Sequence, residues 1–313
     1  MLQRVFQIIC LLIFILGISC QVTSHQVKLY PVKEASELGI SLKPKNLVEI
    51  QVVKVADWEA SLSGLLDLDD PKAKLAGLKD RMEPISIYFY LIKHPNFGTF
   101  LIDSGIGESF TKSPDGFLVN SVLASQMHLD QLKIYETTKS YLSKNKINLK
   151  GVFFTHLHFD HVLGAHEIDR SVPFYVGPGE VTSKQFINLF VQGSTDRLLG
   201  ENPNLFQLDF GKDKTQISVL DFFGDQSFYV FSVPGHTPGS LAFFIPGKPN
   251  SHLILGDSSH TRWGWLEGVT PGSFTTDRNL NRESLNFLKK LEELNKPRFV
   301  YPGHQERISN LEK

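Results

Sequence analysis

Four side chains that can bind a metal ion fall within six residues of this sequence. His156, His158, Asp160 and His161 all lie in the segment Thr155-His156-Leu157-His158-Phe159-Asp160-His161. Side chains two residues apart in an extended segment point the same way, so His156 and His158 could coordinate one ion. Asp160 and His161 come just after the strand, where the chain turns, and could reach a second ion. Imidazole and carboxylate groups suit zinc and related divalent ions.

Three more residues that could bind a metal follow the same local pattern further along the chain. His236, Asp257 and His304 each come after an apolar strand and a glycine, at the exposed end of the strand. Taken alone, a residue in such a position is more often a turn histidine or an aspartate that caps a helix than a metal ligand. The alternative for the first cluster is a set of surface histidines on a loop. Together, however, the five histidines and two aspartates are enough to surround two ions.

Two bound ions would make hydrolysis the expected chemistry. Ions about 3.5–4 Å apart can share a water molecule and lower its pKa towards neutrality. The resulting bridging hydroxide would attack a substrate carbonyl that one metal polarises, while the other metal stabilises the leaving group. Asp160 is the expected catalytic residue that orients the nucleophile or moves its proton. The chain has no Gly-x-Ser-x-Gly motif that would point to a serine nucleophile.

The H-x-H-x-D-H motif with a downstream His, Asp and His closely resembles the metallo-β-lactamase superfamily, over roughly residues 48–313. The resemblance implies an α+β fold, the four-layer αβ/βα sandwich, with two metals at one edge. It also implies two ligand groups: His156, His158 and His236 for one ion, and Asp160, His161 and His304 for the other, with Asp257 bridging both. Asp103, in Leu101-Ile102-Asp103-Ser104-Gly105, resembles the superfamily's strand-end aspartate, which would accept a hydrogen bond from a metal-bound imidazole.

Within this superfamily the chain is most similar to the N-acyl homoserine lactonase-like branch. Both Thr155–His161 and Pro234-Gly235-His236-Thr237-Pro238-Gly239 look like the corresponding lactonase motifs. Those lactonases place a tyrosine three residues after the bridging aspartate, where its hydroxyl contacts the substrate carbonyl. Here that position is His260, which could donate a similar hydrogen bond and so be catalytic, or could be a bystander in a loop.

Several other branches fit less well. The bridging Asp257 weighs against antibiotic hydrolysis, because true metallo-β-lactamases usually lack it. Glyoxalase II proteins carry a C-terminal helical extension, whereas this sequence stops nine residues after His304. No nucleic-acid-binding arm of the tRNA-processing members and no flavodoxin domain is present in the sequence. Fold resemblance alone does not choose the substrate.

We therefore expect a dinuclear metal-dependent hydrolase that cleaves a lactone or a related small ester. Zinc is the expected metal, and manganese, iron or cobalt would suit the same ligands. One alternative is a phosphodiester or sulfate ester hydrolase of the same fold. Another is a lipoprotein that uses the fold as a non-catalytic scaffold, although a degenerate scaffold would be expected to lose ligands. The sequence does not predict an oligomeric state.

Composition and the N-terminus bear on partners and location. The chain of 313 residues is 41% hydrophobic and carries a net charge of −1, so nucleic acid is not an expected partner.

Arg4 precedes a mainly apolar run, Val5–Ile18, of about 14 residues, which is short for a membrane span but typical of an export signal. Leu16-Gly17-Ile18-Ser19-Cys20 resembles a bacterial lipobox, although Gly17 stands where leucine is usual; ordinary signal cleavage is the alternative.

The expected organisation is therefore a signal peptide over residues 1–19, a tether over 20–45 and a hydrolase domain over 46–313. Cys20 would be acylated if the lipobox is used. The protein would then be exported, as a periplasmic or membrane-anchored lipoprotein of a bacterium or as a secreted protein, and would touch the membrane only through that anchor.

The elements that must position the ligands can be traced in two β-rich halves. The first half has strand patterns at 48–55, 85–92, 99–102 and 152–154, and a helical pattern at 121–146. The second has strand patterns at 216–222, 227–233, 241–245, 253–255 and 298–301, and a helical pattern near 283–295. Residues 104–120 and 258–280 are expected to be long loops. In the second loop, Trp263, Trp265, Leu266 and Phe274 could line an acyl pocket or pack the loop down.

Overall fold

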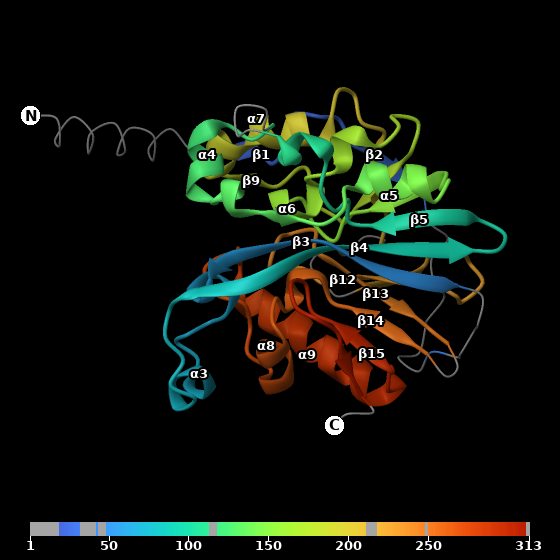
Figure 1. Ribbon diagram of the computed structural model, residues 1–313. Coiled ribbons are helices and arrows are strands. Elements are labelled where there is room, and N and C mark those ends of the chain that lie inside the picture. The colour runs from blue at the N-terminus through green and yellow to red at the C-terminus, as the bar shows by residue number, and fades with distance from the viewer. Residues whose placement is uncertain are drawn as a thin grey trace, which may run out of the picture.

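Two β-sheets face each other in this protein, and helices cover the outer face of each (Figure 1). The structure, a computed structural model, describes residues 19–31, 42, 48–112, 118–210, 218–247 and 250–310. The predicted signal peptide lies outside these residues, except for Ser19. The order of layers is helix, sheet, sheet, helix, which confirms the predicted αβ/βα sandwich.

The first sheet has eight strands among the described residues, and its centre is parallel. Strands β5, β7, β8, β10 and β2 run in one direction, and β4 and β3 form antiparallel pairs at the other side. In spatial order the strands are β2 (Lys28–Tyr30), β10 (Leu205–Leu208), β8 (Phe174–Val176), β7 (Leu149–Phe153), β5 (Gly98–Ile102), β4 (Met82–His94), β3 (Glu49–Ser61) and β6 (Lys133–Ile134). The hairpin predicted from residues 85–102 is the pair β4 and β5.

The second sheet has six strands among the described residues, and a separate two-stranded ribbon lies beside the first sheet. The six strands are, in spatial order, β11 (Ser218–Asp221), β12 (Tyr229–Ser232), β13 (Leu241–Ile245), β14 (His252–Ile254), β15 (Phe299–Tyr301) and β16 (Ile308–Ser309). Only β14 and β15 pair in parallel. The ribbon pairs β1 (Cys20–Gln21) with β9 (Lys184–Gln185).

The helices divide between the two outer layers, as Figure 1 shows for α4 to α7 on one side and α8 and α9 on the other. Among the described residues the α-helices are α2 (Leu62–Leu65), α3 (Pro71–Leu75), α4 (Ser121–Gln126), α5 (Thr138–Lys144), α6 (Phe159–Val162), α7 (Asn188–Leu199), α8 (Arg262–Glu267) and α9 (Arg278–Asn295). Short 3₁₀ turns are η1 (Glu108–Thr111), η3 (Leu129–Gln131), η4 (Ala165–Glu167) and η5 (Gly256–Ser258).

The central strands are apolar on both faces, because each sheet is covered on both sides. In β4, Phe89 and Leu91 pack towards the helices, while Tyr90 and Ile92 enter the core between the sheets. Successive side chains of a strand point to opposite faces, so a strand buried on both sides is a continuous apolar run. This is why short uninterrupted runs such as Leu241–Ile245 could be predicted as strands.

The helix predicted over residues 121–146 is wrong as a single element. The chain forms α4, the turn η3, the short strand β6 and then α5. His128 adopts a left-handed conformation with φ 53°, which ends the first helix. Lys133 and Ile134 then pair with β3, and Thr137 caps α5 by accepting a hydrogen bond from the backbone N–H of Ser140. The apolar spacing of this segment was therefore coincidental.

The structure also differs from the predicted tether over its first residues. Cys20–Gln21 pairs with β9, and Lys28–Tyr30 joins the first sheet beside β10. Between them, Thr23 and Ser24 donate hydrogen bonds to the carboxylate of Asp196 on α7. The folded body therefore includes residues 20–30, while most of the remaining predicted tether lies outside the described residues.

The predicted loop at 258–280 contains a helix, α8, whose N-cap Thr261 accepts a hydrogen bond from the backbone N–H of Gly264. Across the described part of the chain, no helix has both the length and the apolar composition that a membrane crossing requires.

Candidate metal centre

All seven predicted ligands lie at one edge of the two sheets. His156 follows β7, while His236, Asp257 and His304 follow β12, β14 and β15. In the second sheet, β12, β14 and β15 run in the same direction, because β13 is antiparallel to both β12 and β14. The carboxyl ends of strands that run in the same direction meet at one edge, where sites on such sheets usually lie.

The first ligand group consists of His156, His158 and His236. His236 Nε2 lies 3.1 Å from His156 Nε2 and 2.9 Å from His158 Nδ1. Burial, together with the charge of neighbouring histidines, holds the pKa of His156 and His236 well below the ordinary value. Burial also lowers the pKa of His158 to about 4. The three rings are therefore neutral near pH 7, with lone pairs available to a cation.

The second group consists of Asp160, His161, Asp257 and His304. His304 Nε2 lies 3.2 Å from both Asp160 Oδ2 and Asp257 Oδ2, and His161 Nε2 lies 3.4 Å from the same oxygen of Asp257. Burial disfavours the charged form of His304, but the carboxylates of Asp257 and Asp160 outweigh it and raise the pKa to about 10. Burial opposes ionisation of Asp160, yet His161 and His304 bring its pKa well below the usual range.

The two groups share Asp257. Its Oδ2 atom lies 3.5 Å from His236 Nε2 of the first group and 3.2 Å from His304 Nε2 of the second. Each group offers one ligand atom per residue, and within each group these atoms lie within 4.8 Å of one another. The geometry therefore matches the division of ligands that the resemblance implies, with Asp257 between the two groups.

The residues present fit a pair of divalent cations. Three ring nitrogens converge in the first group. One hydrogen atom can link at most two of them, so hydrogen bonds within the group leave one nitrogen without a partner. Within the described part of the chain, two buried atoms of the second group, His161 Nε2 and Asp257 Oδ1, make no hydrogen bond. Buried polar atoms without partners are rare and call for an explanation such as a missing ion. A nitrogen and oxygen donor set of this kind suits zinc, iron or manganese.

Asp103 supports the cluster from behind, as the sequence predicted. Its Oδ2 atom lies 2.8 Å from His161 Nδ1, and its Oδ1 accepts a hydrogen bond of 2.8 Å from the backbone N–H of Thr155. A carboxylate here fixes Nδ1 as the protonated nitrogen and leaves Nε2 free to bind a metal. Asp103 adopts φ 58°, a left-handed conformation that costs about 1 kcal/mol.

Glu180 holds two ligand loops together and was missed in the sequence. Its Oε1 accepts a hydrogen bond of 2.7 Å from the backbone N–H of Leu157, between two ligands of the first cluster. Its Oε2 accepts bonds of 2.6 Å from Thr237 Oγ1 and 3.0 Å from the backbone N–H of Gly239. Burial raises its pKa, although these three donors oppose the shift. A glutamate in a Gly/Pro turn is ordinarily exposed, so its sequence carried no signal of this role.

Two glycines next to the ligands leave no space for a side chain. A Cβ atom on Gly303 would lie 2.0 Å from Asp257 Oδ1. Gly235 adopts φ 138° and a Cβ there would lie 2.2 Å from the backbone nitrogen of Asn281. The Gly-His pairs 235–236 and 303–304 thus allow close packing of the ligand loops.

His260 is also part of the cluster. It is 2% exposed, and its Nε2 lies 3.0 Å from Asp257 Oδ2. Its Nδ1 lies 3.0 Å from the carbonyl oxygen of Leu65. Among the aromatic candidates nearby, Trp265 is fully buried in the core under α9, so it packs the helix and does not line a pocket. Phe274 is 44% exposed, with its ring centre 6.4 Å from that of His260.

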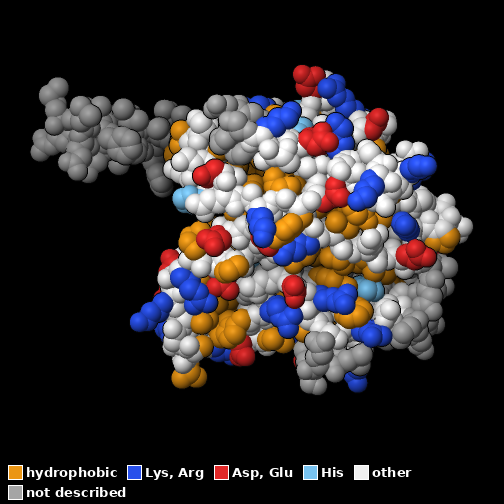
Figure 2. All heavy atoms as spheres, viewed as in Figure 1, with side chains coloured by type: hydrophobic (Ala, Val, Ile, Leu, Met, Phe, Trp, Pro, Cys, Tyr) orange, Lys and Arg blue, Asp and Glu red, His pale blue; other side chains and the backbone are white. Residues whose placement is uncertain are grey.

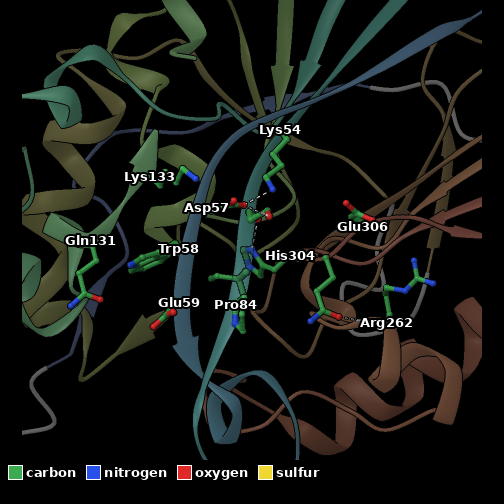
Figure 3. Close-up of a pocket in the computed structure, with 13 residues that line it drawn as sticks. Lys54, Asp57, Trp58, Glu59, Pro84, Gln131, Lys133, Arg262, His304 and Glu306 are labelled. Atoms are coloured by element: carbon green, nitrogen blue, oxygen red, sulfur yellow. Dashed lines mark hydrogen bonds and ion pairs between the residues drawn. The ribbon is translucent and has the colours of Figure 1, made fainter. Parts of the chain in front are cut away.

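An open cleft of about 870 Å³ borders the cluster at His304 (Figure 3). Its walls carry both charge signs, including Lys54, Asp57 and Arg262. His304 Nδ1 lies 3.3 Å from the carbonyl oxygen of Ser86, another wall residue, so His304 connects the cleft to the second ligand group. On the face shown in Figure 2, acidic and basic side chains are likewise intermixed.

The sequence model of the metallo-beta-lactamase superfamily matches residues 82–304, a span that runs from β4 to the last ligand, His304. The chain belongs to this superfamily. The match contains all seven predicted ligands as well as Asp103 and Glu180.

Curated relatives in the superfamily are similar over about half of this chain. Gamma-lactamase FDB1 of Fusarium pseudograminearum (strain CS3096) is 29% identical over 192 residues, which cover 55% of this chain and 45% of that protein. A hydroxyacylglutathione hydrolase of Shewanella loihica (strain ATCC BAA-1088 / PV-4) is 29% identical over 176 residues, which cover 55% of this chain and 54% of that protein. The matched region thus spans about half the length of these relatives.

Solved structures share the fold over most of the chain. A quorum-quenching N-acyl homoserine lactone lactonase superposes with a TM-score of 0.58 and 18% identity, covering 84% of this chain and 94% of that one. AidC, a dizinc quorum-quenching lactonase, gives a TM-score of 0.56 at 17% identity, covering 84% and 90% of the two chains. Similarity at this level of identity establishes the fold alone.

Proposed function

We propose that this protein is a dinuclear metal-dependent hydrolase that cleaves a lactone or a related small ester. The observation that supports it most strongly is the position of Asp257 Oδ2 between two complete ligand groups, 3.5 Å from His236 Nε2 and 3.2 Å from His304 Nε2. Seven buried or half-buried ligands in two groups that share a carboxylate are the arrangement that two-metal hydrolysis requires.

The chain's own residues have distinct parts in this reaction. When bound, the two divalent ions supply a water of lowered pKa and polarise the substrate carbonyl. Asp160 stays ionised because its pKa lies well below the usual range, so its carboxylate can accept a hydrogen bond from the attacking water and orient it. Asp103 and Glu180 hold the ligand loops in position. A hydrogen bond from His260 to a substrate carbonyl, one of the two roles that the sequence left open, is not part of this proposal.

The preference for a lactone or ester over a phosphodiester or sulfate ester rests on two supports. The motifs around His158 and His236 resemble those of the lactonases, although His260 stands where the lactonases have the tyrosine that contacts the substrate. The structural neighbours named as lactonases have the same fold, and a curated relative is named a gamma-lactamase. Cyclic acyl compounds are therefore the first substrates to test.

The test is a substrate panel with the purified, metal-loaded protein. It would contain N-acyl homoserine lactones of several chain lengths, unsubstituted lactones and an aryl ester, beside bis(p-nitrophenyl) phosphate and p-nitrophenyl sulfate. We expect turnover of at least one lactone or ester. Turnover of the phosphodiester or sulfate reporter alone would contradict the lactone assignment while leaving the metal site intact.

Zinc is the proposed metal, and metal analysis of the protein tests it. We expect about two zinc ions per chain. Well under one ion per chain, with no hydrolysis restored by added zinc or manganese, would instead support the non-catalytic scaffold.

We also propose that the protein is exported, with Cys20 as the first residue of the mature chain. The apolar run Val5–Ile18 and the segment ending in Ser19-Cys20 support this proposal. Mass spectrometry of the protein from a bacterial host should show a chain that begins near residue 20, heavier by a lipid if Cys20 is acylated. An intact chain of 313 residues in the cytoplasm would contradict export.

A further inference from the structure

His260 is held in one orientation by two separate anchors. Its ring Nδ1 lies 3.0 Å from the carbonyl oxygen of Leu65, the last residue of α2. Its backbone carbonyl accepts a hydrogen bond of 3.1 Å from the backbone N–H of His304. With 2% of its surface exposed, the ring has no room to turn towards solvent. Its second nitrogen, Nε2, therefore has a fixed position in the cluster.

The partner of Nδ1 decides which nitrogen carries the hydrogen. A carbonyl oxygen can only accept a hydrogen bond, so Nδ1 is the donor and a neutral ring presents a lone pair at Nε2. That lone pair faces Asp257 Oδ2 at 3.0 Å. Two electron-pair donors this close in a buried site repel each other unless a proton or a metal ion lies between them or beside them.

The spacing is that of neighbouring ligands. The other pairs of ligand atoms in the cluster include 3.1 Å between His236 Nε2 and His156 Nε2, and 3.2 Å between His304 Nε2 and Asp257 Oδ2. His260 also lies beside His236, with 4.9 Å between ring centres, and one ligand atom each of His236, Asp257 and His260 lies within 4.8 Å of the other two.

We infer that His260 is an eighth metal ligand, which binds the ion of the first group together with His236 and Asp257. This inference rests on the proposed two-metal function. It gives His260 a role different from that of the lactonases' tyrosine: a ring nitrogen on the ion in place of a hydroxyl on the substrate. Imidazole nitrogen favours zinc or iron over manganese, so the added ligand would also bias metal choice.

Metal retention tests the inference without relying on activity. We would load wild type and the His260→Phe and His260→Gln variants, dialyse them against a graded series of chelator, and count ions per chain. The matched control is His252→Phe, which removes another buried histidine, one that contacts Tyr301 on β15 away from the cluster. Circular dichroism of the metal-free proteins checks folding, and the Gln variant serves if the Phe variant does not fold.

We expect both His260 variants to lose one ion at a chelator concentration that leaves wild type and the control loaded, with affinity for that ion at least about tenfold weaker. With cobalt in the site, the visible absorption bands should also shift in these variants, because the coordination of one ion changes. Unchanged affinity and an unchanged cobalt spectrum in both variants would overturn the inference. Fewer than two ions in wild type would instead contradict the proposed two-metal function.

Discussion

At the scale of single residues, the proposed two-metal chemistry depends most on the position of Asp257. It is buried, its Oδ2 faces both ligand groups, and a Cβ on Gly303 would touch its Oδ1. A carboxylate between two cations neutralises part of their positive charge, which neutral imidazoles cannot do. Its removal should therefore weaken the binding of both ions.

We expect Asp257→Ala to lower kcat/KM at least about 100-fold, because it removes a shared ligand outright, whereas loss of a residue that only supports a ligand costs about 10–100-fold. Steady-state kinetics together with metal content per chain checks this. Asp69→Ala, which removes an exposed carboxylate on the surface, is the matched control. Equal rates for Asp257→Ala and wild type would contradict the two-metal mechanism.

The protonation of the ligands predicts how metal binding depends on pH. In the metal-free protein the pKa of His304 is about 10, and that of His161 is also raised, so both are protonated at pH 7.5. An ion needs the free bases, so filling the second group should release protons, and its affinity should rise about tenfold per pH unit for each proton released. The side chains of the first group have lowered pKa values and should release none.

Titration calorimetry at pH 7.5, in two buffers that differ in heat of ionisation, measures the number of protons released. We expect one of the two ions to release about two protons more than the other, which correspond to His161 and His304. Heats that are independent of the buffer for both ions would contradict the predicted protonation of His161 and His304.

At the scale of elements, the ligands are positioned by the loops that follow strands, and Glu180 joins two of these loops. It accepts hydrogen bonds from the segment after β7 and from the segment after β12, which belong to different sheets. It therefore sets the distance between His158 and His236 without touching a metal.

We expect Glu180→Gln to weaken metal binding in the first group by about 10–100-fold, because the amide keeps the volume but replaces one acceptor oxygen with a donor that faces backbone N–H groups. The metal-free protein should also unfold at lower denaturant concentration, by about 1–3 kcal/mol. Metal titration and urea unfolding measure the two effects. Glu283→Gln, the same chemical change at an exposed position of α9, serves as the control. Unchanged metal affinity would show that Glu180 has no part in positioning the ligands.

At the scale of the whole molecule, the candidate metal centre draws its residues from both sheets. The first sheet supplies His156, His158, Asp160 and His161, and the second sheet supplies His236, Asp257 and His304. Ions bound at this edge would stabilise the folded chain but not the unfolded chain, because unfolding separates the ligands.

We therefore expect chelation to lower the melting temperature by roughly 5–10 °C, since an ion at 100 times its Kd contributes about 2.7 kcal/mol. Differential scanning calorimetry of the loaded and chelated protein measures this, and restored zinc should reverse it. Identical melting temperatures would contradict binding of the ions across both sheets.

The sequence by itself predicted the candidate ligands, because His156, His236, Asp257 and His304 follow apolar strands, and the remaining three lie within five residues of His156 in a motif that resembles the superfamily's. It also determined most strands, since a strand covered on both faces has to be apolar throughout, as in β7 and β13. Spacing alone, however, could not distinguish a helical stripe from coincidence over residues 121–146, where pairing of β6 with β3 decided the backbone.

Only the tertiary structure decided what these residues touch. It brought Glu180 to two loops that are distant in sequence, buried Trp265 under α9, and joined residues 20–30 to the body through β1 and β2. It also turned the Nε2 of His260 to Asp257 because the carbonyl of Leu65 holds the other nitrogen. Local patterns record which side chains a segment offers, whereas long-range hydrogen bonds and packing determine their partners.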